Sequence, residues 1–392
     1  MNHVSLKNIA AIFLHLGVSA FGGLAMLEPI RRRVVDGQAW LSQREFLDGL
    51  ALCQMAPGAT VVQMAAYVGY RLRGAPGGLT AAGAFILPAF FLMGGLSFLY
   101  FHHGELAWVK TASRGFNALV ITLLLQSLWG LGRAVSRGYL DFLVVGAALA
   151  ALAGGVNYFA VFLLAGLLRL GLELWWGGGE IPPISEELSR EPRTAAKTTA
   201  VRILAVGGGL SALAWGLGRL DPVLGQLTVI FLKIGAISFG GGYVMIPILQ
   251  WEVVDHLGWL TLKQFLDGIL LSYVTPGPLL ILATFVGYFV KGLPGAILST
   301  LGVFLPPVLI IFLLYPFYEQ VKTSRWVRPA LQGILAALVA MLALVTLELG
   351  RQALTHWKDL AILAGGGAAL MVCRVSLFWV AVAAAGVSLL IY

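Results

Sequence analysis

A segment long enough to cross a membrane, residues 266–288, is interrupted in its middle by Thr275, Pro276, Gly277 and Pro278. Proline removes a backbone donor and crowds the carbonyl group four residues earlier, so a regular helix does not continue through this tetrapeptide. The backbone groups that are freed need polar partners, which lipid does not supply. The segment is therefore predicted to be a broken helix whose break lies against protein or a water-filled cavity.

A second segment of the same kind occurs earlier in the chain, at residues 47–70, with Pro57 and Gly58 in its middle. The surrounding sequence also recurs: FGG at 21–23 and 239–241, FLDG at 46–49 and 265–268, and VGY at 68–70 and 286–288. The copies are separated by 218 or 219 residues throughout. The chain is therefore a duplicated protein, and paired broken helices in two halves point to the binding site of a transporter.

The composition places the chain in a membrane. Its residues are 59% hydrophobic and 11% charged, whereas a soluble domain carries about 25% charged residues. We expect an all-α polytopic protein with about ten to twelve spans and the lipid bilayer as its surroundings. The net charge of +8 fits Lys and Arg collected in cytoplasmic loops. A nucleic-acid partner is not expected, because it would require a dense basic face on a soluble element.

The organisation follows from the repeat. Residues 1–174 form the first half, residues 175–222 a polar, Pro-rich linker with room for an additional span, and residues 223–392 the second half. Three basic residues of the first half are replaced in the second: Arg31, Arg32 and Arg33 correspond to Gln250, Trp251 and Glu252. Because basic residues favour the cytoplasmic side, the two equivalent turns are expected on opposite sides of the membrane. This pattern predicts an inverted-topology repeat.

With the two copies aligned, the chain resembles the chromate transporter family. The resemblance rests on FGGG at 239–242 with Tyr243 and Pro247, the WL-x4-FLDG run at 259–268, TPGP at 275–278, VGY at 286–288 and FLP at 304–306. The first half carries FGG, WLSQREFLDGLALCQMAPG and FILP, and departs from the family's usual FGGP and PGP at residues 21–24 and 57–59. The resemblance implies a multi-pass exporter of the inner (plasma) membrane. It would confer chromate resistance by ion-gradient-driven export, with sulfate as a second candidate substrate.

Chromate and sulfate are tetrahedral dianions, so their site needs hydrogen-bond donors and positive potential. Half-helices starting at Pro57 and Pro276 would direct free amides and positive dipole ends at the breaks, where anions bind well. Glycine runs let backbone amides approach an ion closely. The predicted substrate-binding residues are Gly22, Gly23, Pro57, Gly58, Thr60, Lys233, Gly240, Gly241, Gly242, Thr275, Pro276 and Gly277. The alternative is that these Gly and Pro residues serve only as hinges and packing sites.

The ionisable residues within apolar stretches are candidates for coupling. Lys233 either faces a cavity or partner or extends to the membrane interface, and its repeat counterpart is His15. Asp48 and Asp267 occupy matching positions, where a carboxylate either carries protons or anchors a helix. Glu28 adjoins three arginines and is expected to form ion pairs. The candidates for coupling or the pathway are His15, Glu28, Asp48, Gln54 and Asp267.

An enzyme and a passive channel are the alternatives to a transporter. An intramembrane enzyme would need a nucleophile, metal or cofactor motif, and the sequence contains no HExxH, CxxC, GxSxG or GxxxxGK[ST] pattern. We therefore expect no enzymatic activity, no cofactor and no metal site. A passive anion channel and a transporter of another oxyanion stay open, although the duplicated breaks favour alternating access. The sequence also leaves the oligomeric state open, a homodimer included.

Overall fold

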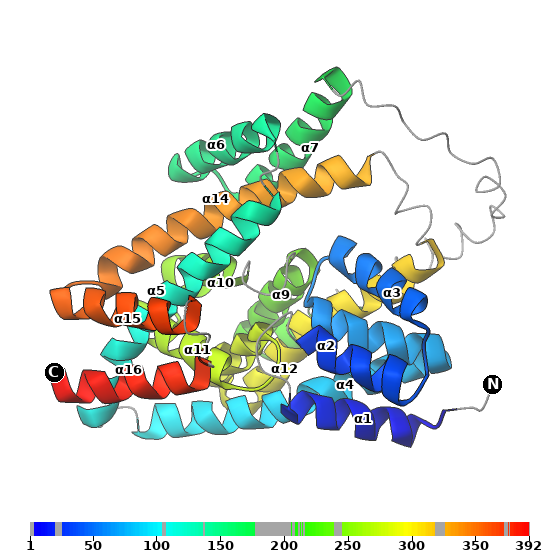
Figure 1. Cartoon of the computed structure of the whole chain (residues 1–392), viewed down its shortest axis with the longest axis horizontal. Helices are drawn as coiled ribbons and strands as arrows, with labels where there is room; N and C mark the ends of the chain where they lie inside the picture. The colour runs from blue at the N-terminus through cyan, green and yellow to red at the C-terminus, as the bar shows by residue number, and fades with distance from the viewer. Residues whose placement is uncertain are drawn as a thin grey trace.

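The computed structural model describes residues 4–19, 26–103, 107–135, 138–176, 216–238, 245–317, 326–371, 375 and 377–391, with separate positions between 205 and 214. Every element in this part of the chain is helical, which confirms the all-α prediction (Figure 1). The first half contains α1 (Leu6–Ser19), α2 (Leu27–Arg31), the π-helix η2 (Arg32–Gly37), α3 (Gln43–Met55), α4 (Thr60–His103), α5 (Ala107–Val135), α6 (Tyr139–Ala153) and α7 (Tyr158–Trp176).

The second half repeats this order. It contains α9 (Pro222–Ile237), α10 (Met245–Gln250), the π-helix η4 (Trp251–His256), α11 (Leu262–Val274), the 3-10 helix η5 (Leu279–Ile281), α12 (Leu282–Leu314), the 3-10 helix η6 (Tyr315–Phe317), α14 (Val327–Ala353), α15 (Trp357–Met371) and α16 (Leu377–Ile391). Most of the predicted linker, residues 177–204, lies outside the described residues.

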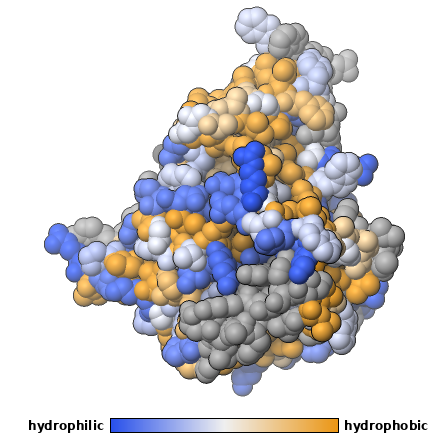
Figure 2. Space-filling model, turned by 90° about the vertical axis from the view of Figure 1, so that its left-hand side faces the viewer, coloured by the Kyte–Doolittle hydropathy of each residue, from blue (hydrophilic) through white to orange (hydrophobic). Residues whose placement is uncertain are grey.

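Four described helices are long and apolar enough to cross a membrane: Thr60–His102, Tyr158–Trp175, Leu279–Phe317 and Pro329–Ala353. Shorter apolar helices accompany them, among them Leu6–Ser19, Tyr139–Ala153 and Pro222–Ile237. Large hydrophobic side chains also lie exposed on α6 and α7, including Phe142, Leu143, Leu163, Leu164 and Leu167. The upper part of the face in Figure 2 is largely hydrophobic, above a more hydrophilic band. A surface of this kind fits contact with lipid; the number of spans stays a prediction.

The two halves fold alike in local detail. Helix α3 begins at a capping box between Ser42 and Glu45, and α11 begins at the matching box between Thr261 and Gln264. Each box satisfies two amides that a helix start leaves without a partner. The π-helices η2 and η4 also occupy matching positions. The duplication is therefore a structural repeat as well as a repeat of sequence.

Helix α12 is a hairpin of two helical arms. Its backbone leaves helical geometry at Lys291 and at Gly292, whose φ is 58°. Across the turn, Thr284 Oγ1 lies 2.7 Å from Thr300 Oγ1, and Ser299 Oγ donates to the Ala283 carbonyl at 2.6 Å. In a straight helix, residues 16 apart in sequence would be separated by about 24 Å. The second arm therefore runs back along the first.

Helix α4 is the equivalent hairpin of the first half. It turns at Arg73 and Gly74, where Gly74 has a φ of 63°. The arms pack so closely that a Cβ atom added to Gly69 would lie 2.2 Å from the Gly77 carbonyl oxygen. Only glycine permits this approach. The turn at Arg73 and Gly74 joins a short arm that follows the first break to a longer returning arm.

The two halves are interlocked. The pair α6 and α7 of the first half packs on α14 of the second, and the pair α15 and α16 of the second half packs on α5 of the first (Figure 1). The hairpins α4 and α12 also pack against each other. Each half therefore depends on the other for part of its core. The central contact is between the two hairpins that follow the breaks.

Candidate functional site

The first predicted break is present between α3 and α4. Helix α3 ends at Met55, and Ala56 is extended, with φ −88° and ψ 144°. Gly58 has a φ of +131°, which favours glycine over other residues. Helix α4 then starts at Thr60 rather than at Pro57, because the backbone of Gly58 is not helical. The break therefore extends over residues 56–59.

The second predicted break is present between α11 and α12. Helix α11 ends at Val274, Thr275 is extended, and Gly277 has a φ of +125°. The chain resumes with η5 at Leu279 instead of Pro276, so here too the helix starts later than the sequence suggested. Thr275 closes the preceding helix through its amide and its Oγ1, which donate to the Leu271 carbonyl at 3.0 and 2.7 Å. Residues 275–278 are all buried.

Each break lies against the hairpin of the opposite half. A Cβ atom added to Gly58 would lie 2.3 Å from Cβ of Pro307 in α12, and one added to Gly277 would lie 2.7 Å from Cβ of Ala89 in α4. Pro307 and Ala89 are themselves repeat counterparts, 218 residues apart. The two breaks thus have reciprocal environments. Sequence reasoning missed these contacts, since nothing in the local pattern identifies a partner so far along the chain.

The start of α4 supplies free backbone donors. Its first internal bond runs from the Gln63 amide to the Ala59 carbonyl at 2.9 Å. The amides of Thr60, Val61 and Val62 therefore have no acceptor within the helix, and the positive end of the helix dipole lies here. The Gly58 amide instead donates to the Ser238 carbonyl of the second half at 2.5 Å. The arrangement suits an anion at the helix start and ties the break to α9.

The two matching aspartates have different surroundings. Asp267 in α11 is only 3% exposed, and its Oδ2 accepts a hydrogen bond of 2.6 Å from the hydroxyl of Tyr100. Tyr100 belongs to the longer arm of α4, in the other half. Asp48 in α3 is partly exposed. The carboxylate of the second half is therefore held at the contact between the halves, and Tyr100 is a partner that the sequence did not reveal.

Three further candidates lie on exposed surfaces. The side chains of His15 in α1, Gln54 in α3 and Lys233 in α9 are all exposed. The residues of the two breaks are mostly buried. The structure therefore does not bring these three residues into the packing around either break.

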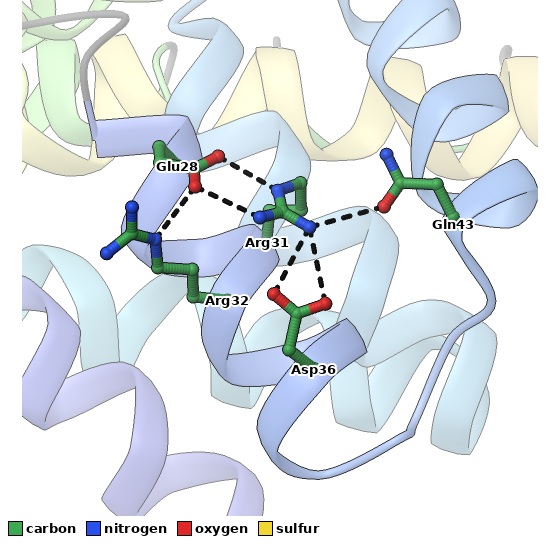
Figure 3. Close-up of polar contacts among 5 residues, drawn as sticks. All are labelled: Glu28, Arg31, Arg32, Asp36 and Gln43. Carbon is green, nitrogen blue, oxygen red and sulfur yellow. Dashed lines mark hydrogen bonds and ion pairs between the residues drawn. The ribbon is translucent and has the colours of Figure 1, made fainter.

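Glu28 belongs to an exposed network of charges on α2 and η2 (Figure 3). Arg31 Nε and Arg32 Nε contact its carboxylate at 2.9 and 2.8 Å, and Arg31 also pairs with Asp36 at 3.2 Å. Gln43 accepts a further bond from Arg31. The hydrogen bonds from Arg31 and Arg32 lower the pKa of Glu28 to about 2. Glu28 is therefore ionised near neutral pH, which supports ion pairing over proton transfer.

The equivalent turn of the second half is acidic and aromatic instead of basic. Glu252 in η4 is 7% exposed and accepts a 2.8 Å hydrogen bond from the hydroxyl of Tyr158 in α7. The ring of Tyr158 lies edge-on to Trp251, with centroids 5.1 Å apart. The sequence showed the exchange of charge at this turn, but it did not predict the buried contact with α7.

The five glycines of the predicted glycine runs lie outside the described residues: Gly22, Gly23, Gly240, Gly241 and Gly242. Ser238 is the last described residue before the second run, and its carbonyl accepts the Gly58 amide.

A buried ion pair in the first half was also missed. Arg169 in α7 is 8% exposed and its Nε lies 2.8 Å from Oδ1 of Asp141 at the start of α6. Arg169 also pairs with Glu173 one turn later. These contacts fix α6 against α7. Across the described ranges, no three or more His, Cys, Asp or Glu side chains gather as metal ligands would.

Comparison with known proteins agrees with this two-part architecture. The family model described as chromate transporter matches residues 7–170 and again residues 225–389. No solved structure gives a significant match. The duplication seen in the helices therefore corresponds to two copies of one family unit.

Individual relatives cover nearly the whole chain. A transporter of Methanocaldococcus jannaschii, described as uncharacterized, is 32% identical over 363 residues, which is 92% of this chain and 88% of the relative. The chromate transport protein of Cupriavidus metallidurans is 31% identical over 89% of this chain and 84% of its own length. That of Pseudomonas aeruginosa is 32% identical over 89% of this chain and 82% of its own length. The chain is a multi-pass membrane transporter, not an enzyme, and it belongs to the chromate transporter family.

Proposed function

We propose that this protein exports chromate from the cytoplasm across the inner (plasma) membrane, driven by an ion gradient, with sulfate as a second candidate substrate. The observation that carries the proposal is the reciprocal placement of the two breaks, each against the hairpin of the other half. The relatives from Cupriavidus metallidurans and Pseudomonas aeruginosa are named chromate transport proteins. A duplicated unit with broken helices at its centre fits a secondary transporter.

The proposed binding site is centred on the first break. Amides of Thr60, Val61 and Val62 at the start of α4 donate to the oxyanion, and the helix dipole adds positive potential. Gly58 lets the backbone turn sharply into this helix. Thr275 and Gly277 contribute the equivalent break of the second half. Partial charges of this kind bind a dianion less tightly than a charged side chain would. This suits a transporter, whose site must also release the dianion.

The proposed movement is a shift of the two hairpins relative to each other. Because Gly58 contacts Pro307 and Gly277 contacts Ala89, displacement of one hairpin changes the environment of both breaks. In an inverted repeat this exchange opens the site first to one side and then to the other. The arginines near Glu28, which are replaced by Gln250, Trp251 and Glu252 in the second half, support opposite orientations of the two halves.

We place proton coupling at Asp267. It is a buried carboxylate at the contact between the halves and accepts a hydrogen bond from Tyr100. Asp267→Asn keeps an acceptor for Tyr100 but removes the titratable group. This variant is expected to insert normally and to lose the dependence of transport on the proton gradient, whereas Asp48→Asn retains it. Chromate flux with and without an imposed pH difference measures both variants. An Asp267→Asn protein with wild-type gradient dependence would make Asp267 a structural anchor.

Uptake of labelled chromate into inverted membrane vesicles tests the proposed direction. Such vesicles turn cellular export into uptake, so the protein should accumulate chromate inside them when a gradient is imposed, and sulfate should compete if it is a substrate. Vesicles without the protein are the control. Gradient-independent equilibration would indicate a passive channel, and absence of chromate movement would contradict the proposed substrate.

A further inference from the structure

The side chain of Gln63 folds back over the start of α4 and into the first break. It is fully buried, with 0% exposure. Its Nε2 donates to the Pro57 carbonyl at 2.6 Å, and a Cβ atom added to Gly58 would lie 3.0 Å from the same nitrogen. The amide group of Gln63 is therefore positioned within the break itself, one helical turn after Thr60.

The other end of this amide has an unused acceptor. Among the described residues, Gln63 Oε1 is buried and has no hydrogen-bond partner. The contact between Nε2 and Pro57 fixes the orientation, because exchanging the nitrogen and oxygen would place two acceptors 2.6 Å apart. A buried acceptor without a donor is unfavourable, because it has lost its hydrogen bond to water. A ligand that brings a donor to this position would remove that cost.

The first break thus combines two kinds of polar group. The amides of Thr60, Val61 and Val62, which have no acceptor within α4, are donors, and the Oε1 atom of the next residue, Gln63, is an acceptor. The second break lacks this acceptor, because Ile281 and Leu282 occupy the positions equivalent to Gln63. A bare dianion such as sulfate offers only acceptors and leaves Gln63 Oε1 without a partner. An oxyanion that carries one proton satisfies both kinds of group.

We propose that the first break binds the singly protonated oxyanion, hydrogen chromate, with its hydroxyl donating to Gln63 Oε1 and its remaining oxygens accepting from the amides at the start of α4. This inference rests on the proposed chromate transport. Hydrogen chromate forms near neutral pH, whereas sulfate is protonated only in strong acid. Gln63 is therefore a specificity residue that favours chromate over sulfate, because a site built to bind a hydroxyl discriminates strongly against an analogue that lacks it.

The titratable groups around the break decide whether a pH dependence of chromate binding could come from the protein and not from the anion. The contacts described around it come from the uncharged residues Ser238 of α9 and Pro307 of α12. On the helices that form the break, Cys53 is buried in α3, and the Tyr67 hydroxyl in α4 donates to the Glu45 carbonyl. The charged group of α9, Lys233, is exposed. His15 of α1, which packs on α4, is also exposed, and Asp48 of α3 is partly exposed. A change of chromate affinity between mildly acidic and alkaline pH that Gln63→Met removes is therefore assigned to protonation of the anion.

Equilibrium binding of radiolabelled chromate to the purified full-length protein tests the inference. For the wild type, affinity for total chromate should fall with rising pH in parallel with the fraction of hydrogen chromate. Gln63→Met keeps the length of the side chain and removes the acceptor. We expect it to lose about tenfold in affinity at mildly acidic pH and little at alkaline pH. Gln126→Met makes the same change on an exposed face of α5 and should bind as the wild type does.

Several results would overturn this inference. An equal loss of affinity in Gln63→Met at both pH values would mean that Gln63 only supports the shape of the break. No loss of affinity would mean that a structural water, and not the substrate, donates to Oε1. Wild-type affinity that is independent of pH would reject hydrogen chromate as the bound species while leaving chromate transport standing, and this comparison does not require a folded variant. A wild-type protein that binds no chromate at either pH would overturn the proposed function together with the inference.

Discussion

Gly58 and Gly277 are the residues at which the two helices are interrupted, and each has a positive φ that other residues rarely adopt. Each also lies too close to the opposite half to accommodate a side chain, against Pro307 and Ala89 respectively. Backbone conformation and packing therefore require glycine at the same two positions. A residue with these two constraints cannot be replaced without moving a hairpin.

Gly277→Ala is expected to destabilise the protein by about 1–3 kcal/mol through backbone strain and to reduce chromate transport severely. The added Cβ would lie 2.7 Å from that of Ala89, so the hairpins must separate. Gly94→Ala is the matched control, because it lies in a helical arm of α4 with no atom within 4 Å of an added Cβ. Thermal unfolding in detergent and vesicle flux measure the two effects. Wild-type flux in Gly277→Ala would remove this break from the transport mechanism.

The breaks could be predicted from the sequence because proline and glycine act locally. Pro57, Gly58, Pro276 and Gly277 disrupt a helix whatever surrounds them. The partners of the site could not be predicted, because Tyr100 and Asp267 are 167 residues apart in sequence. The exposure of the Lys233 and His15 side chains could not be predicted from the sequence either, since a charged residue in an apolar stretch can face either a cavity or the surface.

The hairpins α4 and α12 are the elements that connect each break to the opposite half. Sharp turns at Gly74 and Gly292 divide them into two arms. The Gly-Ala-Pro-Gly sequence at residues 74–77 is typical of such a turn. The π-helices η2 and η4 were not predicted, because a change from α to π hydrogen bonding leaves no distinctive residue pattern.

A disulfide across α12 tests whether its arms fold back on each other. Thr284→Cys/Thr300→Cys, in a protein whose Cys53 and Cys373 are replaced by Ala, should form a bridge on mild oxidation, because the two Thr Oγ1 atoms lie 2.7 Å apart. A continuous helix would separate the positions by about 24 Å, far beyond disulfide reach. Thr284→Cys/Ile310→Cys is the control pair. Mass spectrometry reports the bridge, and its absence in the Thr284 and Thr300 pair would contradict the hairpin.

The exchange of helix pairs makes the two halves one unit. Helices α6 and α7 cover α14, while α15 and α16 cover α5. The duplication was predicted from the recurring motifs, because identical local patterns fold alike. The exchange was not predicted, since the motifs are weakest in these terminal helices of each half and say nothing of which half they pack on.

The inverted orientation makes a specific prediction about labelling. Gly37 at the end of η2 and His256 at the end of η4 are both exposed and occupy equivalent positions. In a protein without its natural cysteines, Gly37→Cys should react with a membrane-impermeant maleimide only from the cytoplasmic side and His256→Cys only from the opposite side. Intact and inverted vesicles distinguish the two sides. Labelling of both variants from one side would establish a parallel repeat.

We expect this chain alone to move chromate by coupling its transport to an ion gradient. Purified protein reconstituted into liposomes tests it most directly, with labelled chromate present at equal concentrations inside and outside and a proton gradient then imposed. Net accumulation of chromate on one side is expected, and both collapse of the gradient and Gly277→Ala should abolish it. Chromate that stays at equal concentrations despite the gradient, in liposomes that contain correctly inserted protein, would contradict it.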